Sequence, residues 1–432
     1  MSDTSATEPE AEPEVFEVLA APGDGVPDVV DDAAGLAAVV DSLSQGSGPV
    51  AVDAERASGY RYGQDAYLVQ LRREGSGTHL IDPLGCPDLS SVDRALADTE
   101  WVLHAATQDI PCLAALGMRP RRLFDTELGA RLAGLPKVGL SSVLEYYLGL
   151  TLAKEHSAVD WSTRPLPTPW LLYAALDVEL LVPLRDRMVR DLSEQGKLAW
   201  AKQEFDALTS FTGPKTKPDP WRRVSGTRAL RTRRHLATLR EVWNTREEIA
   251  RHRDVAPGRI VPDSTLVDLA LRAPRRRADL PAVKPDPHGA RQRRAQQGLR
   301  RHAAEWLAAI SAAAEIPEDE LPQRGVSTPG PPPARSWADR DPDAAARLNA
   351  TKPLMKALSD QHDIPVENLV TPEALRRVLW QPPQTLELAS VEAALAEVGA
   401  RPWQQQIVAP VVLQALGSLS GATRLEWEIS HM

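Results

Sequence analysis

The sequence predicts an α/β domain with a central mixed sheet, followed by two small all-α domains. Short runs with strand composition alternate with helical periods in the first half of the chain, and only helical periods follow. Two Pro-rich stretches, Phe211 to Trp221 and Glu315 to Pro342, separate the parts. The length of 432 residues is enough for about three domains, each with its own core.

Composition excludes several classes of protein. Hydrophobic residues make up 43% of the chain, yet no uninterrupted apolar run approaches the roughly 20 residues of a membrane span. The acidic residues 1–15 predict a disordered tail and no secretory or transit peptide. Cys86 and Cys112 are the only cysteines and have no Cys-x-x-Cys spacing, which argues against a disulfide framework or zinc site. We expect a cytoplasmic monomer with no membrane partner.

The net charge of −9 conceals an uneven distribution. Residues 221–300 contain 20 Lys+Arg against 8 Asp+Glu, a net charge of +12, so the rest of the chain carries −21. A basic module beside acidic ones is typical of nucleic-acid contact, but a solvated arginine-rich surface would have the same composition. Both interpretations remain open on composition alone.

The elements of the first half follow in a simple order. A helical pattern over residues 31–45 precedes a strand that ends in Asp53-Ala54-Glu55. Tyr67 to Leu71 and Thr78 to Asp82 predict a hairpin around Gly75-Ser76-Gly77. A helix over residues 89–97 and a fourth strand over residues 101–104 follow, and helical periods then dominate up to residue 198. These elements predict a mixed sheet flanked by helices.

Two carboxylates end the opening strand on one face. Asp53 and Glu55 alternate with apolar residues, so both project to the same side, where their charges repel unless a cation lies between them. A hard divalent ion such as Mg²⁺ takes oxygen ligands of this kind. Among 59 acids, however, Asp-x-Glu also occurs by chance on solvated surface. A second copy, Asp125-Thr126-Glu127, predicts a helix N-cap and a first-turn acid, which is a structural role.

Two further acids lie at the starts or along the faces of helices. Asp109 falls in the first turn of a helix that Thr107 is predicted to cap, where the helix dipole favours an acid without any catalytic role. Tyr173 and Asp177 share one face of a long helix that begins at Thr168-Pro169 and that Pro183 should kink. Alone, a Tyr-Asp pair of this kind is usually core-edge packing beside a solvated acid.

The order Asp-x-Glu, Asp, Tyr-x-x-x-Asp resembles the DEDD 3′–5′ exonucleases with a tyrosine in the third motif, and in particular the ribonuclease D family. Further segments carry the same resemblance: His104-Ala105, Phe124-Asp125-Thr126, Asp160-Trp161-Ser162 with Arg164-Pro165-Leu166, and Tyr173-Ala174-Ala175-Leu176-Asp177. The resemblance implies a ribonuclease H-like α/β fold for residues 16–208.

The resemblance also implies a metal site. Asp53 would bridge two divalent ions, Mg²⁺ or Mn²⁺, while Glu55 and Asp177 complete the site that activates water and Asp109 holds the second ion through solvent. Tyr173 would orient the attacking water. A phenol with its usual pKa near 10 is a poor base, so activation of the water falls to the metal.

Substrate contacts are less defined by the pattern. Arg56 stands where the family commonly has an aromatic residue, and its guanidinium can contact a phosphate or stack on a base. His104 and Trp161 are further candidates for contact with the substrate. Their ordinary interpretations are a histidine at the sheet edge and a buried tryptophan.

The second half is predicted to hold two helical domains. After a linker (residues 209–221), residues 222–314 contain LREVWNTREEIARHRDVAPGRIVPDSTLVDLALRAP, which is similar to the HRDC module that usually binds nucleic acid. A Pro-rich connector (residues 315–342) leads to a second, divergent HRDC-like domain (residues 343–425). Arginines around Arg275-Arg276-Arg277 and residues 291–294 can hold a phosphate backbone. For the acidic second domain, packing against the catalytic domain is an equally open interpretation.

The resemblance implies a metal-dependent 3′–5′ exoribonuclease that hydrolyses single-stranded RNA 3′ ends to nucleoside 5′-monophosphates, with tRNA precursors or other stable RNA as substrates. A DNA exonuclease with the same chemistry is the first alternative. The second is a nucleic-acid-binding scaffold with an inactive catalytic domain, which would lack some of the acids. A helicase is excluded because the chain has no Gly-x-x-x-x-Gly-Lys-Ser/Thr phosphate loop.

Overall fold

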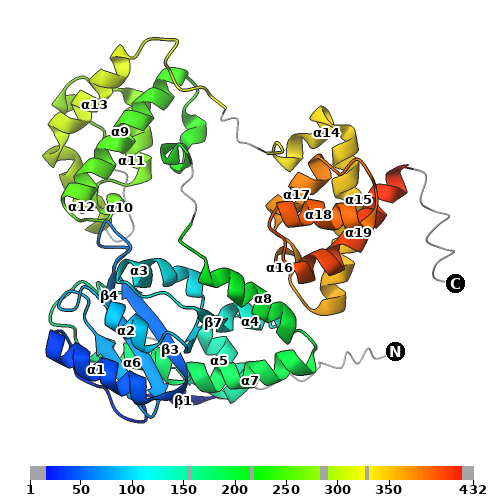
Figure 1. Cartoon of the computed structure of the whole chain (residues 1–432). Coiled ribbons are helices and arrows are strands. Elements are labelled where there is room, and N and C mark those ends of the chain that lie inside the picture. Colours follow the sequence, from blue (N-terminus) through cyan, green and yellow to red (C-terminus); the bar gives the residue numbers. More distant parts are fainter. Residues whose placement is uncertain (1–15, 153–157, 215–217, 283–289, 326–329, 421–432) are drawn as a thin grey trace, which may run out of the picture.

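The computed structural model describes residues 16–152, 158–214, 218–282, 290–325 and 330–420. An α/β domain (residues 16–214) is followed by a first helical unit (residues 218–325) and a second helical unit (residues 330–420), as Figure 1 shows. The predicted tail, residues 1–15, lies outside the described residues. Within the described ranges, every helix is too short or too polar to cross a membrane.

A six-stranded mixed sheet forms the centre of the α/β domain. Its strand order is β2-β5-β4-β3-β6-β7, and β3 pairs antiparallel with β4 and parallel with β6. The predicted meander and fourth strand are confirmed. The strands are β2 (Val29–Val30), β3 (Ser47–Arg56), β4 (Ala66–Glu74), β5 (Gly77–Ile81), β6 (Glu100–Leu103) and β7 (Arg122–Asp125), while β1 (Glu17–Leu19) pairs with β8 (Leu150–Leu152) apart from this sheet.

Helices cover both faces of the sheet because the side chains of its central strand alternate. Val50 and Val52 of β3 pack in one core with residues of α1, α2 and α3, whereas α6 crosses the opposite face over β3, β4 and β5. The helices are α1 (Ala33–Gln45), α2 (Ser90–Ala95), the 3-10 helix η1 (Ala106–Gln108), α3 (Ile110–Ala115), α4 (Thr126–Leu132), α5 (Leu140–Leu148), α6 (Thr168–Glu179), α7 (Leu181–Glu194) and α8 (Leu198–Thr209).

The long helix predicted from Thr168 is divided at Leu180, three residues before the expected kink at Pro183. A proline has no N–H for the carbonyl four residues earlier, and its ring clashes with that carbonyl. The carbonyl in question belongs to Glu179, the last residue of α6. The break therefore ends α6 shortly after Asp177 and lets α7 leave in a new direction.

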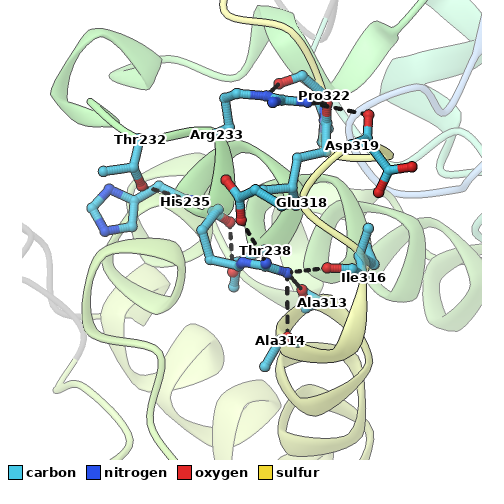
Figure 2. A network of polar contacts seen from close by, with 12 residues as sticks. Thr232, Arg233, His235, Thr238, Ala313, Ala314, Ile316, Glu318, Asp319 and Pro322 are labelled. Atoms are coloured by element: carbon cyan, nitrogen blue, oxygen red, sulfur yellow. Dashed lines mark hydrogen bonds and ion pairs between the residues drawn. The ribbon is translucent and has the colours of Figure 1, made fainter.

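Arginines at the start of α9 donate hydrogen bonds to the end of α13 and to the segment that follows it (Figure 2). Arg234 donates to the carbonyls of Ala313 (2.9 Å) and Ile316 (2.6 Å) at the end of α13, where carbonyls have no partner within the helix. Arg233 donates to Leu321 at 2.5 Å, so the first part of the predicted connector is fastened to this unit. The unit contains η2 (Pro220–Arg223), η3 (Thr227–Ala229), α9 (Arg233–His252), α10 (Pro257–Ile260), α11 (Asp263–Arg272), η4 (Arg277–Asp279), α12 (Ala290–Arg301) and α13 (Ala303–Glu315).

The second helical unit repeats the order of the first. In the described part of each unit, a long α-helix is followed by a one-turn α-helix and three further α-helices. A residue one or two positions after the long helix has positive φ: Asp254 at 47° and Asp363 at 50°. Trp337, at the end of the predicted connector, is fully buried in this unit. The unit contains η5 (Ala334–Ser336), α14 (Trp337–Arg340), α15 (Pro342–His362), α16 (Val366–Leu369), α17 (Pro372–Trp380), α18 (Leu388–Glu397) and α19 (Pro402–Ser420).

The first helical unit contacts the loop that follows β3. Arg61 of this loop donates to the Asp254 carboxylate at 3.2 Å, and the backbone N–H of Tyr62 donates to the same carboxylate at 3.3 Å. The N–H of Ala256 donates to the carbonyl of Tyr60 at 2.9 Å. The turn after α9 is thus joined to the α/β domain.

The second helical unit packs on α8 and on the turn after α4. Trp403 stacks on Trp200 with ring centroids 5.0 Å apart, and its indole N–H donates to Glu204 at 2.8 Å. The turn at Asp363 lies so close to Gly134 that a Cβ there would be 2.7 Å from the Asp363 carbonyl oxygen. These contacts favour the packing role that the sequence left open for the acidic unit.

Gly298→Ala should destabilise the first helical unit by about 1–3 kcal/mol, because α12 and α10 touch at this glycine. A Cβ at Gly298 would lie 2.1 Å from the carbonyl oxygen of Ile260, and both helices would have to separate. Gly258→Ala is the matched control, since a Cβ there meets nothing within 4 Å. Urea unfolding of the three proteins measures the difference; equal stability of the two variants would contradict this helix packing.

Candidate metal centre

Three carboxylates meet where α6 crosses the end of β3. Asp53 and Glu55 project from one face of β3, and α6 brings Asp177 over that face. One carboxylate oxygen from each residue lies within 4.8 Å of the other two. Three hard oxygen donors at this separation fit a divalent cation.

The electrostatics of this group favour a bound cation. Burial, the largest cause, raises the pKa of all three acids above the usual range. For Glu55 the charges of Asp53, Asp177 and Asp109 add to burial and raise the pKa to about 10. Ionised carboxylates are therefore unfavourable here unless positive charge accompanies them.

Asp109 reaches the same group from the turn after β6. It is 4% exposed, and burial together with the charge of Asp53 raises its pKa well above the usual range. The Arg56 guanidinium, 3.9 Å from its carboxylate, acts in the opposite direction. Asp109 occupies the N-cap of α3 itself, whereas the sequence placed the cap at Thr107.

The second Asp-x-Glu explains how this turn is held. Asp125 has the predicted N-cap role and accepts from the N–H groups of Glu127 (2.9 Å) and Leu128 (3.1 Å). It also accepts from the N–H groups of Ala105 (3.2 Å) and Ala106 (2.8 Å). Ala105 has φ of +59°, a conformation that costs energy without such support, so Asp125 helps to fix the turn that carries Asp109.

Tyr173 lies one turn before Asp177 on α6, and both side chains line the same cleft. Burial and the neighbouring acids raise the pKa of the Tyr173 phenol above its usual value of 10. The phenol is therefore neutral and acts as a donor of a hydrogen bond, not as a base.

An open cleft of about 840 Å³ lies over these groups. Some of its lining was not predicted from the sequence, because Gly139-Leu140-Ser141-Ser142 has only the pattern of an ordinary helix start. The lining that was missed comprises Ala54, Gln108, Gly139, Leu140, Ser141, Ser142, Leu152, Ala158, Val159 and Leu181.

Two of the three predicted substrate contacts line this cleft. Arg56 donates to Gln108 at 3.1 Å, and Nδ1 of His104 lies 2.9 Å from the Thr126 hydroxyl. Burial lowers the pKa of His104 to about 4, so this histidine is uncharged at neutral pH. Trp161 is fully buried, which corrects the expectation that it contacts substrate directly.

Trp161 belongs instead to the packing behind Tyr173. Its ring lies 6.4 Å from that of Tyr173, and Arg164 holds its carbonyl at 2.8 Å. Arg164 also pairs with the buried Asp82 at 2.5 and 2.7 Å and donates to Tyr67 at 2.7 Å. Arg164 and Trp161 therefore fix the segment before α6, which packs against that helix.

Comparison with known families divides the chain in three. Residues 27–193 match the family model described as 3′–5′ exonuclease, and residues 235–310 match the HRDC domain. Residues 330–416 match a different model, described as 3′ to 5′ exonuclease C-terminal domain. The repeated helix order of the two units is thus accompanied by divergent sequences.

Individual relatives match most of the chain. This chain is 31% identical over 296 residues to ribonuclease D of Sphingobium indicum, and the match spans 65% of this chain and 72% of the relative. The structure of a protein from Bifidobacterium adolescentis matches with a TM-score of 0.82 and 37% identity over 93% of this chain and all of that one. Escherichia coli RNase D matches with a TM-score of 0.65 and 26% identity over 90% and 98%. With four acids and a tyrosine gathered at one cleft, the chain belongs to the ribonuclease D family of 3′–5′ exonucleases.

Proposed function

We propose that this protein removes nucleotides from the 3′ ends of single-stranded RNA as nucleoside 5′-monophosphates. The observation that carries the proposal is the convergence of Asp53, Glu55 and Asp177 within 4.8 Å at an open cleft. The Escherichia coli relative is described as an exoribonuclease involved in structured RNA processing, which supports maturation of tRNA precursors or other stable RNA as the task.

In this proposal the acids hold two divalent ions, Mg²⁺ or Mn²⁺. When bound, the ions supply an activated water and charge relief at the leaving 3′-oxygen. Asp53 would contribute to both ion positions, Glu55 and Asp177 to the one that activates water, and Asp109 to the other. The raised pKa values of these acids support this assignment. They show that the ionised carboxylates are unfavourable in this site without a neighbouring positive charge, which a bound cation would provide.

The remaining groups of the cleft act on water and RNA. Tyr173 orients the attacking water by donating a hydrogen bond from its hydroxyl, which lies in the cleft beside Asp177. Arg56 offers a guanidinium to a phosphate or a base, and His104 offers an uncharged ring.

The first helical unit supplies a basic groove for the RNA backbone. Several arginines of the unit are used internally, such as Arg246, which is 6% exposed and pairs with Asp263 at 2.8 Å. Others line an open groove beside α12, where they can neutralise phosphates without reading sequence. The groove consists of Arg277, Arg293, Gln296, Gln297, Arg300 and Arg301.

All four acids lie in one cleft of a single chain, so the proposed site needs no residue from a second copy, as in the monomer that we propose. Cys86 and Cys112 are buried free thiols, as expected for a protein of the reducing cytoplasm.

Asp53→Ala should abolish release of nucleotides from a 5′-labelled RNA in the presence of Mg²⁺ or Mn²⁺, because the bridging ligand is lost. Glu127→Gln is the matched control: this acid of the second Asp-x-Glu pairs with Arg131 and should leave activity unchanged. Gel analysis of the products measures both. Equal cleavage by wild type and Asp53→Ala, or none by either, would reject the proposal and, in the second case, favour the inactive scaffold.

A DNA strand of the same sequence, digested in parallel, distinguishes the rival nuclease. The proposal requires faster hydrolysis of RNA. Faster hydrolysis of DNA would assign the same chemistry to a DNA exonuclease.

Tyr173→Phe should leave a folded enzyme whose turnover is lower by about 10²-fold, the typical effect of a poorly oriented nucleophile. The phenol is not a metal ligand in this proposal, so Mn²⁺ affinity should stay close to that of the wild type. Single-turnover rates and Mn²⁺ titrations test the two statements separately. A large loss of Mn²⁺ affinity would show that Tyr173 supports the ligands and not the water.

Stabilisation by Mg²⁺ should increase between about pH 6 and pH 9. In the metal-free protein the raised pKa of Glu55, about 10, means that its protonated form favours folding, a contribution lost as pH rises through that value. Metal ions must displace these protons, so they bind better at the higher pH. Melting temperatures with EDTA and with Mg²⁺ measure the effect, and Asp53→Ala should reduce it. A shift that is the same at both pH values would contradict the assignment.

A further inference from the structure

Gln70, in the middle of β4, is a buried amide without a partner. Its side chain is fully buried, and among the described residues neither Oε1 nor Nε2 has a hydrogen-bond partner. Burying an amide without such partners is costly, and native proteins rarely leave one unsatisfied without a reason. We therefore expect this amide to form a hydrogen bond in the working protein that it does not form here.

Strand register places Gln70 beside the metal centre. It pairs with Asp53 across the antiparallel β3–β4 ladder, and residues opposite each other in such a ladder project to the same face. On its other side it pairs with Leu80 of β5. Along β4 its same-face neighbours are Leu68 and Arg72.

Of these neighbours, only Asp53 can accept from Nε2. Leu68 and Leu80 are apolar and fully buried. Arg72 has donors only, and it is already paired with Asp24 at 2.9 Å and Glu179 at 3.2 Å. We propose that Gln70 is a positioning residue that donates from Nε2 to the Asp53 carboxylate, directly or through one water, and so fixes the oxygens that face the cations.

This inference rests on the proposed metal-dependent function and extends it to a residue outside the DEDD-Tyr pattern. An amide suits the task because it donates to a carboxylate without adding positive charge that would compete with the cations. Groups that orient a metal-ligating carboxylate typically change metal affinity by about 10- to 100-fold when they are removed.

Gln70→Met tests the proposal, since methionine keeps similar volume and removes the donor. Mn²⁺ affinity of the full chain, measured by titration without RNA, should fall by about 10- to 100-fold. The melting temperature in EDTA should stay the same or rise, because an unsatisfied amide is removed. Leu80→Met, the neighbour across β5, is the matched control and should keep wild-type Mn²⁺ affinity.

Three results would overturn the proposal. One is wild-type Mn²⁺ affinity in Gln70→Met, and another is a drop in its metal-free melting temperature that accounts for the loss of affinity. The third is an equal loss in Glu179→Gln, because Glu179 also has a buried oxygen without a partner and a water could join it to Gln70. Failure of the metal-dependent function itself would appear differently, as wild-type protein that binds no Mn²⁺.

Discussion

Repulsion among carboxylates that are wholly or partly buried is the constraint on which the α/β domain depends. Asp53, Glu55, Asp109 and Asp177 come from three separate segments, and burial disfavours the ionised form of each. Such a cluster persists only if rigid elements hold it. A central strand, a turn tied by Asp125 and a helix packed across the sheet supply that rigidity. A bound cation would relieve the repulsion among the acids, and this relief would add to the free energy of cation binding.

The helical units are extensions of this domain and not loosely attached modules. Arg259 of the first unit lies over the Tyr60 ring at 3.9 Å and donates to the Gly59 carbonyl at 2.7 Å. Gly59 and Tyr60 also line a small cavity with Glu55 and Arg56, so the first unit touches the wall of the active cleft. The second unit shares a continuous hydrophobic core with the α/β domain. The first helical unit and the acidic cleft are thus joined through one loop after β3.

Sequence patterns predicted the parts of the site that depend on local periodicity. Alternation placed Asp53 and Glu55 on one face, and helical spacing joined Tyr173 to Asp177. Contacts between distant segments were not accessible in this way. The depth at which Trp161 lies, the approach of Ser141 and Ser142 to the cleft, and the orphan amide of Gln70 depend on packing across the whole domain. The turn at Ala105 depends on Asp125, twenty residues later, and no local rule indicates it.

The turn after each long helix carries a further consequence. Asp254 and Asp363 adopt the same left-handed conformation, yet one receives hydrogen bonds from a loop while the other presents its backbone to a glycine. Both helical units therefore contact the α/β domain through the corresponding corner, although the surfaces that the two corners meet differ. The first unit has arginines along an open groove, whereas the second contacts α8 through the stacking of Trp403 on Trp200. An aspartate with left-handed backbone conformation therefore marks the contact with the α/β domain in both units.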